Sequence, residues 1–274
     1  MIKKIFVVTI LLFSSLLLSG CGLKKSATKA GGTSGANPTP TPTKPIEQTI
    51  KERPFVSLLP SADSHWLTLE IKKIIEGTSS LEYELIYFAE VEGNRIERGV
   101  STAGSPVELA SQAEFSKKIL LGSASCTTGT CKYKYDEGVN EGTMTLTLSG
   151  ASGKEKYESV FRIQKGKEGK EGLTTGDGVF SFVSTNFPAT SVYLTISSVG
   201  VPSSLPSGVV PKTVPYGIFS SGAIKGGTVT FKTVLTTTSI YAFDGKAWSK
   251  LTTEISNGEA KATSSGQNIF ILAE

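Results

Sequence analysis

Histidine is almost absent from this sequence of 274 residues, and this scarcity excludes several classes of function. His65 is the only histidine, so the chain cannot build a multi-histidine metal site, and a Ser-His-Asp triad would depend on this one residue. His65 precedes Trp66 at the start of an expected strand, which favours a surface or half-buried structural role. The chain also lacks the motifs Gly-x-Ser-x-Gly, Gly-x-x-x-x-Gly-Lys and His-Glu-x-x-His. We therefore expect no catalytic set, no bound metal and no cofactor.

The sequence also lacks a large excess of charge of either sign. It contains 28 basic and 24 acidic side chains, and two of the basic ones, Lys3 and Lys4, lie in a leader that we expect to be removed. A chain this close to neutrality does not indicate a nucleic-acid partner. Threonine, serine and glycine are abundant, whereas long helical patterns are scarce, which favours an all-β, extracytoplasmic protein.

Only one long apolar run is present, and it is too short to span a membrane. Residues 5–18 are apolar except for Thr9, Ser14 and Ser15, and they follow the basic pair Lys3 and Lys4. As a helix this run would extend roughly 20 Å, less than the ~30 Å hydrocarbon core of a bilayer. The pattern is typical of a secretory signal peptide, which we assign to residues 1–20.

The residues that end this leader predict how the protein is anchored. The motif Leu18-Ser19-Gly20-Cys21 resembles the lipobox of bacterial lipoproteins. The resemblance implies cleavage before Cys21, a diacylglycerol thioether on its sulfur, and attachment to the extracytoplasmic side of the cell membrane. Each buried CH₂ contributes about 0.8 kcal/mol, so two or three acyl chains would hold the protein persistently. An ordinary secretory signal with an incidental cysteine, or a retained anchor, are the alternatives.

Composition divides the remaining chain into a tether and two domains. Residues 21–52 are rich in Gly, Ser, Pro and Thr, cannot offset their ordering entropy by burial, and are expected to form a disordered tether. A ligand for a proline-recognition domain is the alternative for its Pro-Thr repeats. We expect two β-sandwich domains, at residues 53–165 and 178–274, joined by the Gly-interrupted charged linker 166–177. A long hairpin loop is the alternative for the charged segment.

Alternating strands in the first domain predict a sandwich of the immunoglobulin or fibronectin type. The clearest strand is 82–88, which places Tyr83, Leu85 and Tyr87 on one face. Residues 107–121 fit either a helix or two strands, and we favour two strands because apolar residues alternate near Phe115.

The second domain contains a strong hairpin signal. Asp244-Gly245 separates Ile240-Tyr241-Ala242-Phe243 from Ala247-Trp248. Together with Leu251-Thr252, Gly258 and the run 269–272, this order resembles the ZU5-like β-sandwich segments of bacterial surface proteins. The resemblance implies a structural or adhesive role and no catalysis.

Two loops carry candidate binding chemistry. Once Cys21 is committed to lipid, Cys126 and Cys131 remain as a pair, which predicts a disulfide that clips a hairpin in an oxidising compartment. Free thiols, or a metal or redox site, are the alternatives for this pair. The loop 136–142 could bind calcium because oxygen ligands suit this ion, although its spacing does not match an EF-hand, and a polar turn is the alternative. The candidate calcium ligands are Asp136, Glu137, Asn140 and Glu141.

Aromatic residues on strands could stack on sugars, and the candidates are Trp66, Trp248, Tyr241 and Tyr216. Packing within a core or hairpin is the alternative for all of them. These observations predict a lipid-anchored cell-envelope module, structural or binding in the manner of an adhesin and without catalytic activity. Its expected ligand is an envelope polysaccharide or protein. A glycan-binding or glycan-hydrolysing lipoprotein is the alternative, and glycan hydrolysis would require two suitably spaced carboxyl groups.

Overall fold

The computed structural model describes residues 48–274. The predicted signal peptide, Cys21 and most of the predicted tether therefore lie outside the described residues. Residues 48–52, which end that tether, form a turn in which the backbone N–H groups of Glu52 and Arg53 donate to the carbonyl oxygen of Thr49. No helix within residues 48–274 has the length and apolar character needed to cross a membrane.

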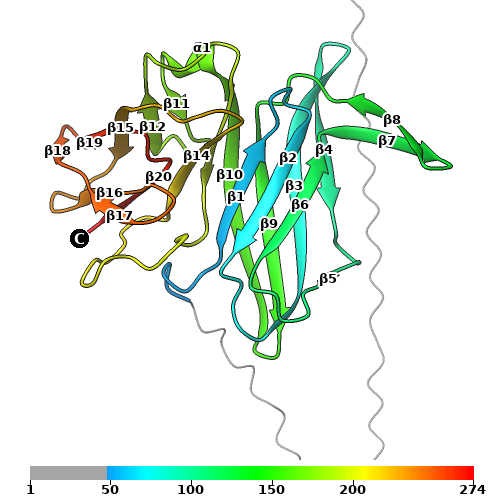
Figure 1. Ribbon diagram of the computed structural model, residues 1–274, viewed down its shortest axis with the longest axis horizontal. Helices are drawn as coiled ribbons and strands as arrows, with labels where there is room; N and C mark the ends of the chain where they lie inside the picture. Colours follow the sequence, from blue (N-terminus) through cyan, green and yellow to red (C-terminus); the bar gives the residue numbers. More distant parts are fainter. Residues whose placement is uncertain (1–47) are drawn as a thin grey trace, which may run out of the picture. The chain divides into compact units, whose positions relative to one another are not determined.

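The described chain is all-β, as predicted, and its strands pair antiparallel in four sheets (Figure 1). A three-stranded sheet contains β1 (Phe55–Pro60), β2 (Trp66–Lys72) and β6 (Phe115–Leu120). A ten-stranded main sheet has the order β17-β16-β20-β14-β13-β10-β9-β3-β4, and β5 also pairs with β3. Its strands are, along the chain, β3 (Thr78–Val91), β4 (Asn94–Ser101), β5 (Val107–Glu108), β9 (Glu141–Gly150), β10 (Gly153–Lys165), β13 (Val192–Ser197), β14 (Tyr216–Ser220), β16 (Ser239–Phe243), β17 (Trp248–Lys250) and β20 (Ile269–Ala273).

Two smaller sheets and one short helix complete the fold. The five-stranded sheet has the order β11-β12-β15-β19-β18, with bounds β11 (Leu173–Thr174), β12 (Phe180–Val183), β15 (Gly227–Lys232), β18 (Thr253–Ser256) and β19 (Glu259–Ser264). The two-stranded sheet consists of β7 (Gly122–Thr127) and β8 (Thr130–Tyr135). The helix, α1, spans Gly166–Gly169.

Alternation of buried and solvent-facing residues explains the strands of the first half. In β3 the residues Leu81, Tyr83, Leu85, Tyr87 and Ala89 are buried, and the residues between them are less so. This confirms the predicted common face of Tyr83, Leu85 and Tyr87. The ambiguous region 107–121 forms β5 and β6, so the preference for two strands is also confirmed. The buried face of β3 packs against the three-stranded sheet, which contains β6, and the two sheets form one hydrophobic core.

Four second-half strands of the main sheet, β13, β14, β16 and β20, are buried on both faces. In β20, Phe270 and Leu272 join a second core with the five-stranded sheet, whereas Ile269, Ile271 and Ala273 join the first core. In β16, Tyr241 and Phe243 belong to the first core, whereas Ile240 and Ala242 belong to the second. Such strands read as continuous apolar runs because no face meets water.

The two sandwiches share the main sheet. The predicted linker 166–177 contains α1 and β11, and β11 pairs with β12 of the second sandwich. The main sheet continues past this segment because β10 pairs with β13, with Phe161 opposite Ile196. The described residues accordingly belong to one compact unit.

Two hairpin turns can be compared with the sequence signals. The Asp244-Gly245 turn is present, and Phe243 pairs with Trp248 across it. The sequence signal Gly93-Asn94 predicts a second turn, and the structure has this turn one residue earlier. Glu92 and Gly93 have φ values of 51° and 77°, and Asn94 already pairs with Val91. A two-residue turn with both φ values positive matches the twist of the flanking strands.

Candidate functional site

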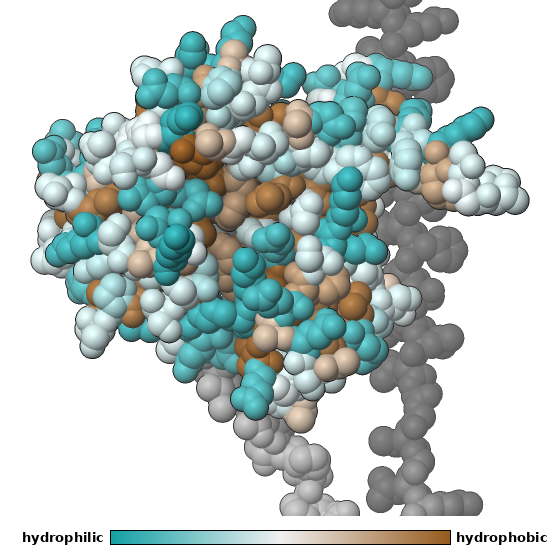
Figure 2. Space-filling model, viewed as in Figure 1, coloured by the Kyte–Doolittle hydropathy of each residue, from teal (hydrophilic) through white to brown (hydrophobic). Residues whose placement is uncertain are grey.

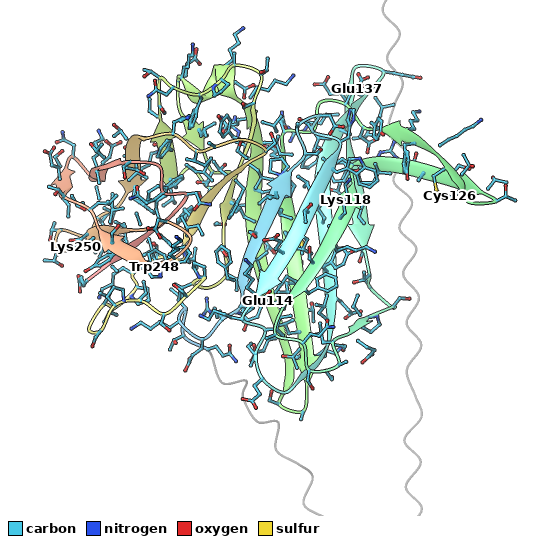
Figure 3. All side chains as sticks on the ribbon, viewed as in Figure 1. Glu114, Lys118, Cys126, Glu137, Trp248 and Lys250 are labelled. Carbon is cyan, nitrogen blue, oxygen red and sulfur yellow. A yellow bond between two sulfur atoms is a disulfide. The ribbon has the colours of Figure 1, made fainter. Side chains whose placement is uncertain are left out.

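A hairpin formed by β7 and β8, residues Gly122–Tyr135, projects from the body and is called the arm here (Figure 1). Thr128 and Gly129 turn the chain with positive φ values of 47° and 86°. Cys126 pairs with Cys131 in the strand register, and their sulfurs form a disulfide near the outer end of the arm (Figure 3). The predicted disulfide is therefore present, and Cys126 and Cys131 are not free thiols in this structure.

Most side chains of the arm are exposed, and its two tyrosines form an aromatic row with residues of the body. Tyr133 and Tyr135 lie on one face of β8 because they are two residues apart. The Tyr135 ring stacks on His65, with centroids 3.8 Å apart and planes 2° from parallel. Trp66 meets the Tyr133 ring edge-on at 5.5 Å, and the two tyrosine rings lie 6.2 Å apart within 10° of parallel. We call Trp66, Tyr133, Tyr135 and His65 the aromatic row.

The aromatic row is open to solvent at its centre. Tyr133 is 46% exposed and Tyr135 is 37% exposed, whereas Trp66 is half-buried. The ammonium group of Lys118 lies 4.5 Å from the centroid of the Trp66 ring, so a cation covers that end of the row. Figure 2 shows the surrounding surface as polar side chains with separate apolar patches.

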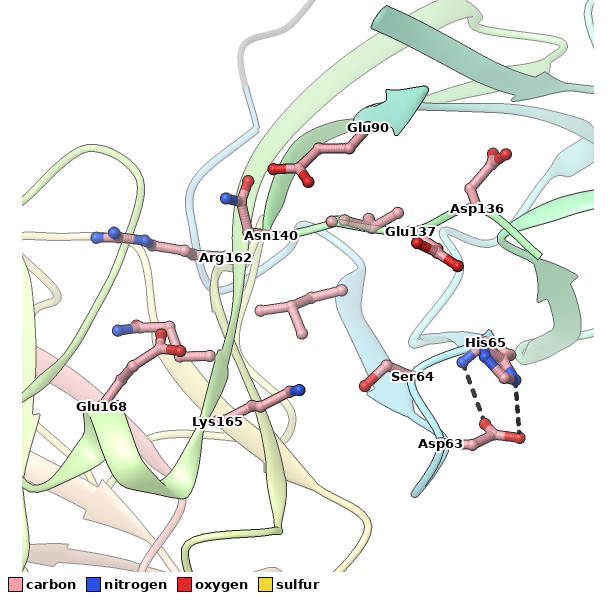
Figure 4. Close-up of a pocket in the computed structure, with 14 residues that line it drawn as sticks. Asp63, Ser64, His65, Glu90, Asp136, Glu137, Asn140, Arg162, Lys165 and Glu168 are labelled. Atoms are coloured by element: carbon pink, nitrogen blue, oxygen red, sulfur yellow. Dashed lines mark hydrogen bonds and ion pairs between the residues drawn. The ribbon is translucent and has the colours of Figure 1, made fainter. Parts of the chain in front are cut away.

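The other end of the aromatic row borders a polar pocket of about 400 Å³ (Figure 4). His65 belongs both to the row and to the pocket wall. The pocket is lined by more acidic than basic side chains: the acidic ones are Asp63, Glu90, Asp136, Glu137 and Glu168, and the basic ones are Arg162 and Lys165. This balance attracts cationic or hydroxyl-rich groups and repels anions.

Asp63 is held in its charged form by local hydrogen bonds. Its carboxylate accepts from the Ser61 hydroxyl at 2.5 Å and from the backbone N–H of His65 at 3.1 Å, and it lies 3.2 Å from Nδ1 of His65. These contacts, the Ser61 hydrogen bond first, lower the pKa of Asp63 below its ordinary value. The same contacts fix the start of β2 and hence the orientation of His65.

The four predicted calcium ligands are not gathered at one point. Asp136, Glu137 and Asn140 line the pocket, but Glu141 is outside it and forms an ion pair with Arg95. Within residues 48–274, no group of three or more His, Cys, Asp or Glu side chains is arranged to hold a metal ion.

Asp136 already has protein partners. It accepts a hydrogen bond from the Tyr87 hydroxyl at 2.8 Å and lies 3.8 Å from Nε of Arg98. Burial, followed by this hydrogen bond, raises the pKa of Tyr87. The Asp136 carboxylate therefore helps to join β3 to the base of the arm.

The predicted sugar-stacking residues do not form one surface. Tyr241 and Trp248 are each 9% exposed, and Trp248 packs on Phe243 and donates from Nε1 to the carbonyl oxygen of Ser203 at 3.3 Å. Tyr216 is buried against Phe180 and donates to Asp177 at 2.8 Å.

Of the predicted stacking set, Trp66 belongs to the aromatic row, and its neighbours there are Tyr133, Tyr135 and His65. Tyr133 and Tyr135 were not among the predicted stacking residues. The available signal was the alternation Lys132-Tyr133-Lys134-Tyr135 directly after Cys131, because it places both rings on one face of an exposed strand.

The chain matches no protein-family model, no curated protein and no solved structure.

Proposed function

We propose that this protein is a lipid-anchored, extracytoplasmic binding module of a bacterial cell envelope, without catalytic activity. The observation that carries the binding role is the arm, which exposes two tyrosines beside a polar pocket on an otherwise tightly packed β scaffold. Exposed aromatic residues on a rigid support are typical of recognition surfaces. The anchoring half of the proposal rests on the lipobox resemblance at Cys21.

The two halves of this proposal complement each other physically. Acyl chains on Cys21 would hold the module at the membrane, and residues 22–47 would set its reach from the surface. Tethering raises the local concentration of the module near envelope components, so even weak contacts at the arm would persist.

Anchoring is tested by fractionating cells that produce the full chain or its Cys21→Ser variant. The full chain is expected in the membrane fraction and the variant in the soluble fraction or the medium. Mass spectrometry of the membrane-bound protein should find acyl chains on Cys21. Persistent membrane attachment of Cys21→Ser would contradict lipid anchoring.

Binding is tested with the soluble form, residues 22–274, mixed with washed envelopes of the producing bacterium. The arm variant replaces residues 123–134 by Asn-Gly, which can close the ladder because Gly122 and Tyr135 are strand partners. The soluble form should sediment with envelopes and the arm variant should not. Ser207→Ala, on a distant exposed loop, is the matched control and should sediment normally. Equal sedimentation of the arm variant would refute the binding role of the arm.

A further inference from the structure

The two tyrosine rings of the aromatic row are partly exposed to solvent and are therefore accessible to a ligand. One end of the row is closed by Lys118 on the Trp66 ring, and the other end by the stacking of His65 on Tyr135. Between them Tyr133 and Tyr135 remain 46% and 37% exposed. Lys132 and Lys134 point to the opposite face of β8, since neighbouring strand residues alternate. One face of the arm is therefore aromatic, and its other face is cationic.

We propose that the aromatic row binds a polysaccharide of neutral or amino sugars, with one sugar unit entering the pocket beside His65. This inference rests on the proposed binding role of the arm and names its ligand class. A pyranose ring has a face of C–H groups with partial positive charge, which suits the negative face of an aromatic ring. Its hydroxyl and amino groups project from the ring edge, where they can donate to carboxylates.

The charges of the pocket choose between sugar classes. Asp63, Glu90 and Glu137 line the pocket together with His65, and acidic side chains outnumber basic ones in the lining. The hydrogen bonds to Asp63 keep that carboxylate ionised. An amino sugar would gain Coulomb attraction at this wall, a neutral sugar would gain hydrogen bonds, and a uronic acid or a nucleic-acid phosphate would be repelled.

The test measures binding of sugar hexamers to the soluble form by isothermal titration calorimetry at pH 6. Hexamers of glucosamine and glucose should bind, glucosamine more tightly, whereas hexagalacturonate and oligothymidylate should not. Tyr133→Ala combined with Tyr135→Ala should weaken binding by roughly tenfold or more, as expected for lost aromatic stacking. Lys132→Ala combined with Lys134→Ala, on the opposite face of the same strand, should change affinity by less than about twofold. Glu137→Gln should weaken glucosamine binding more than glucose binding.

A second measurement does not depend on those substitutions. The chain has two tryptophans, and Trp248 is buried in the core, so a Trp248→Phe background leaves the emission of Trp66 alone. Saturation with the glucosamine hexamer should change that emission. Thermal unfolding of the two double variants in β8 should match that of the unsubstituted soluble form, because the arm is a separate sheet.

The outcomes separate this inference from the proposed function. Absence of binding by both sugar hexamers, unchanged affinity in the double tyrosine variant, or tighter binding of hexagalacturonate or oligothymidylate would overturn the glycan assignment. If sedimentation with envelopes still depends on the arm in any of those cases, the binding role stands and its ligand is of another class. If sedimentation does not depend on the arm either, the glycan assignment and the binding role of the arm are both wrong.

Discussion

Ser198 closes the free edge of β1, and its replacement by alanine should destabilise the whole fold. Its hydroxyl donates to the carbonyl oxygen of Val56 at 2.8 Å and accepts from the N–H of Val56 at 3.1 Å. Ser198 and Val56 are 2% and 1% exposed, so water does not reach either group readily. One side chain from the second half of the chain thus satisfies both backbone groups of Val56, a residue of the edge strand β1.

The expected cost follows from the two groups left without partners. An unsatisfied buried donor or acceptor costs about 1–3 kcal/mol, so Ser198→Ala should lower the free energy of unfolding by roughly 2–4 kcal/mol once partial relaxation is allowed for. For a chain of this length the corresponding fall in the melting temperature is about 5–15 °C. Urea denaturation and calorimetry of the soluble form measure both quantities.

The control is Ser207→Ala, whose exposed side chain should contribute less than about 0.5 kcal/mol. If Ser198→Ala were as mild as Ser207→Ala, the double hydrogen bond across the two halves would not be a stabilising contact. A second, separate unfolding transition appearing only in Ser198→Ala would show instead that this contact couples the two sandwiches.

Two further predictions concern local elements. Reducing the Cys126–Cys131 disulfide should release only about 2 kcal/mol of chain-entropy stabilisation, confined to the arm because its two strands form a sheet of their own. Amide exchange should speed up in residues 123–134 while the global unfolding midpoint stays unchanged, and a clear drop in that midpoint would contradict this view. Asp244 accepts backbone hydrogen bonds from Ala247 and Lys246, both at 2.8 Å, which lower its pKa. Its contribution is therefore present above the ordinary aspartate pKa of about 3.9 and is lost as the pH falls through the lowered value. Unfolding curves of the soluble form and Asp244→Ala should differ at pH 6 and converge near pH 2, whereas a constant difference would contradict the assignment.

Local sequence determined the strands, several turns and the disulfide of this protein. Period-two alternation was sufficient for β3, since every second residue from Leu81 to Ala89 is buried. Asp244-Gly245 specified its hairpin because few residues besides Gly tolerate the required φ, and spacing brought Cys126 and Cys131 within reach on facing strands.

Tertiary structure decided how distant strands pair and which side chains reach solvent. The pairing of β10 with β13, which lets two sandwiches share one sheet, depends on contacts that no local pattern encodes. The same is true of the aromatic residues: Trp66 and Trp248 look alike in sequence, yet one lies at the foot of an exposed arm and the other lies in the core. Burial depends on how the layers of the fold assemble. The candidate site likewise exists only in the tertiary structure, where the arm places Tyr133 against Trp66 and Tyr135 against His65.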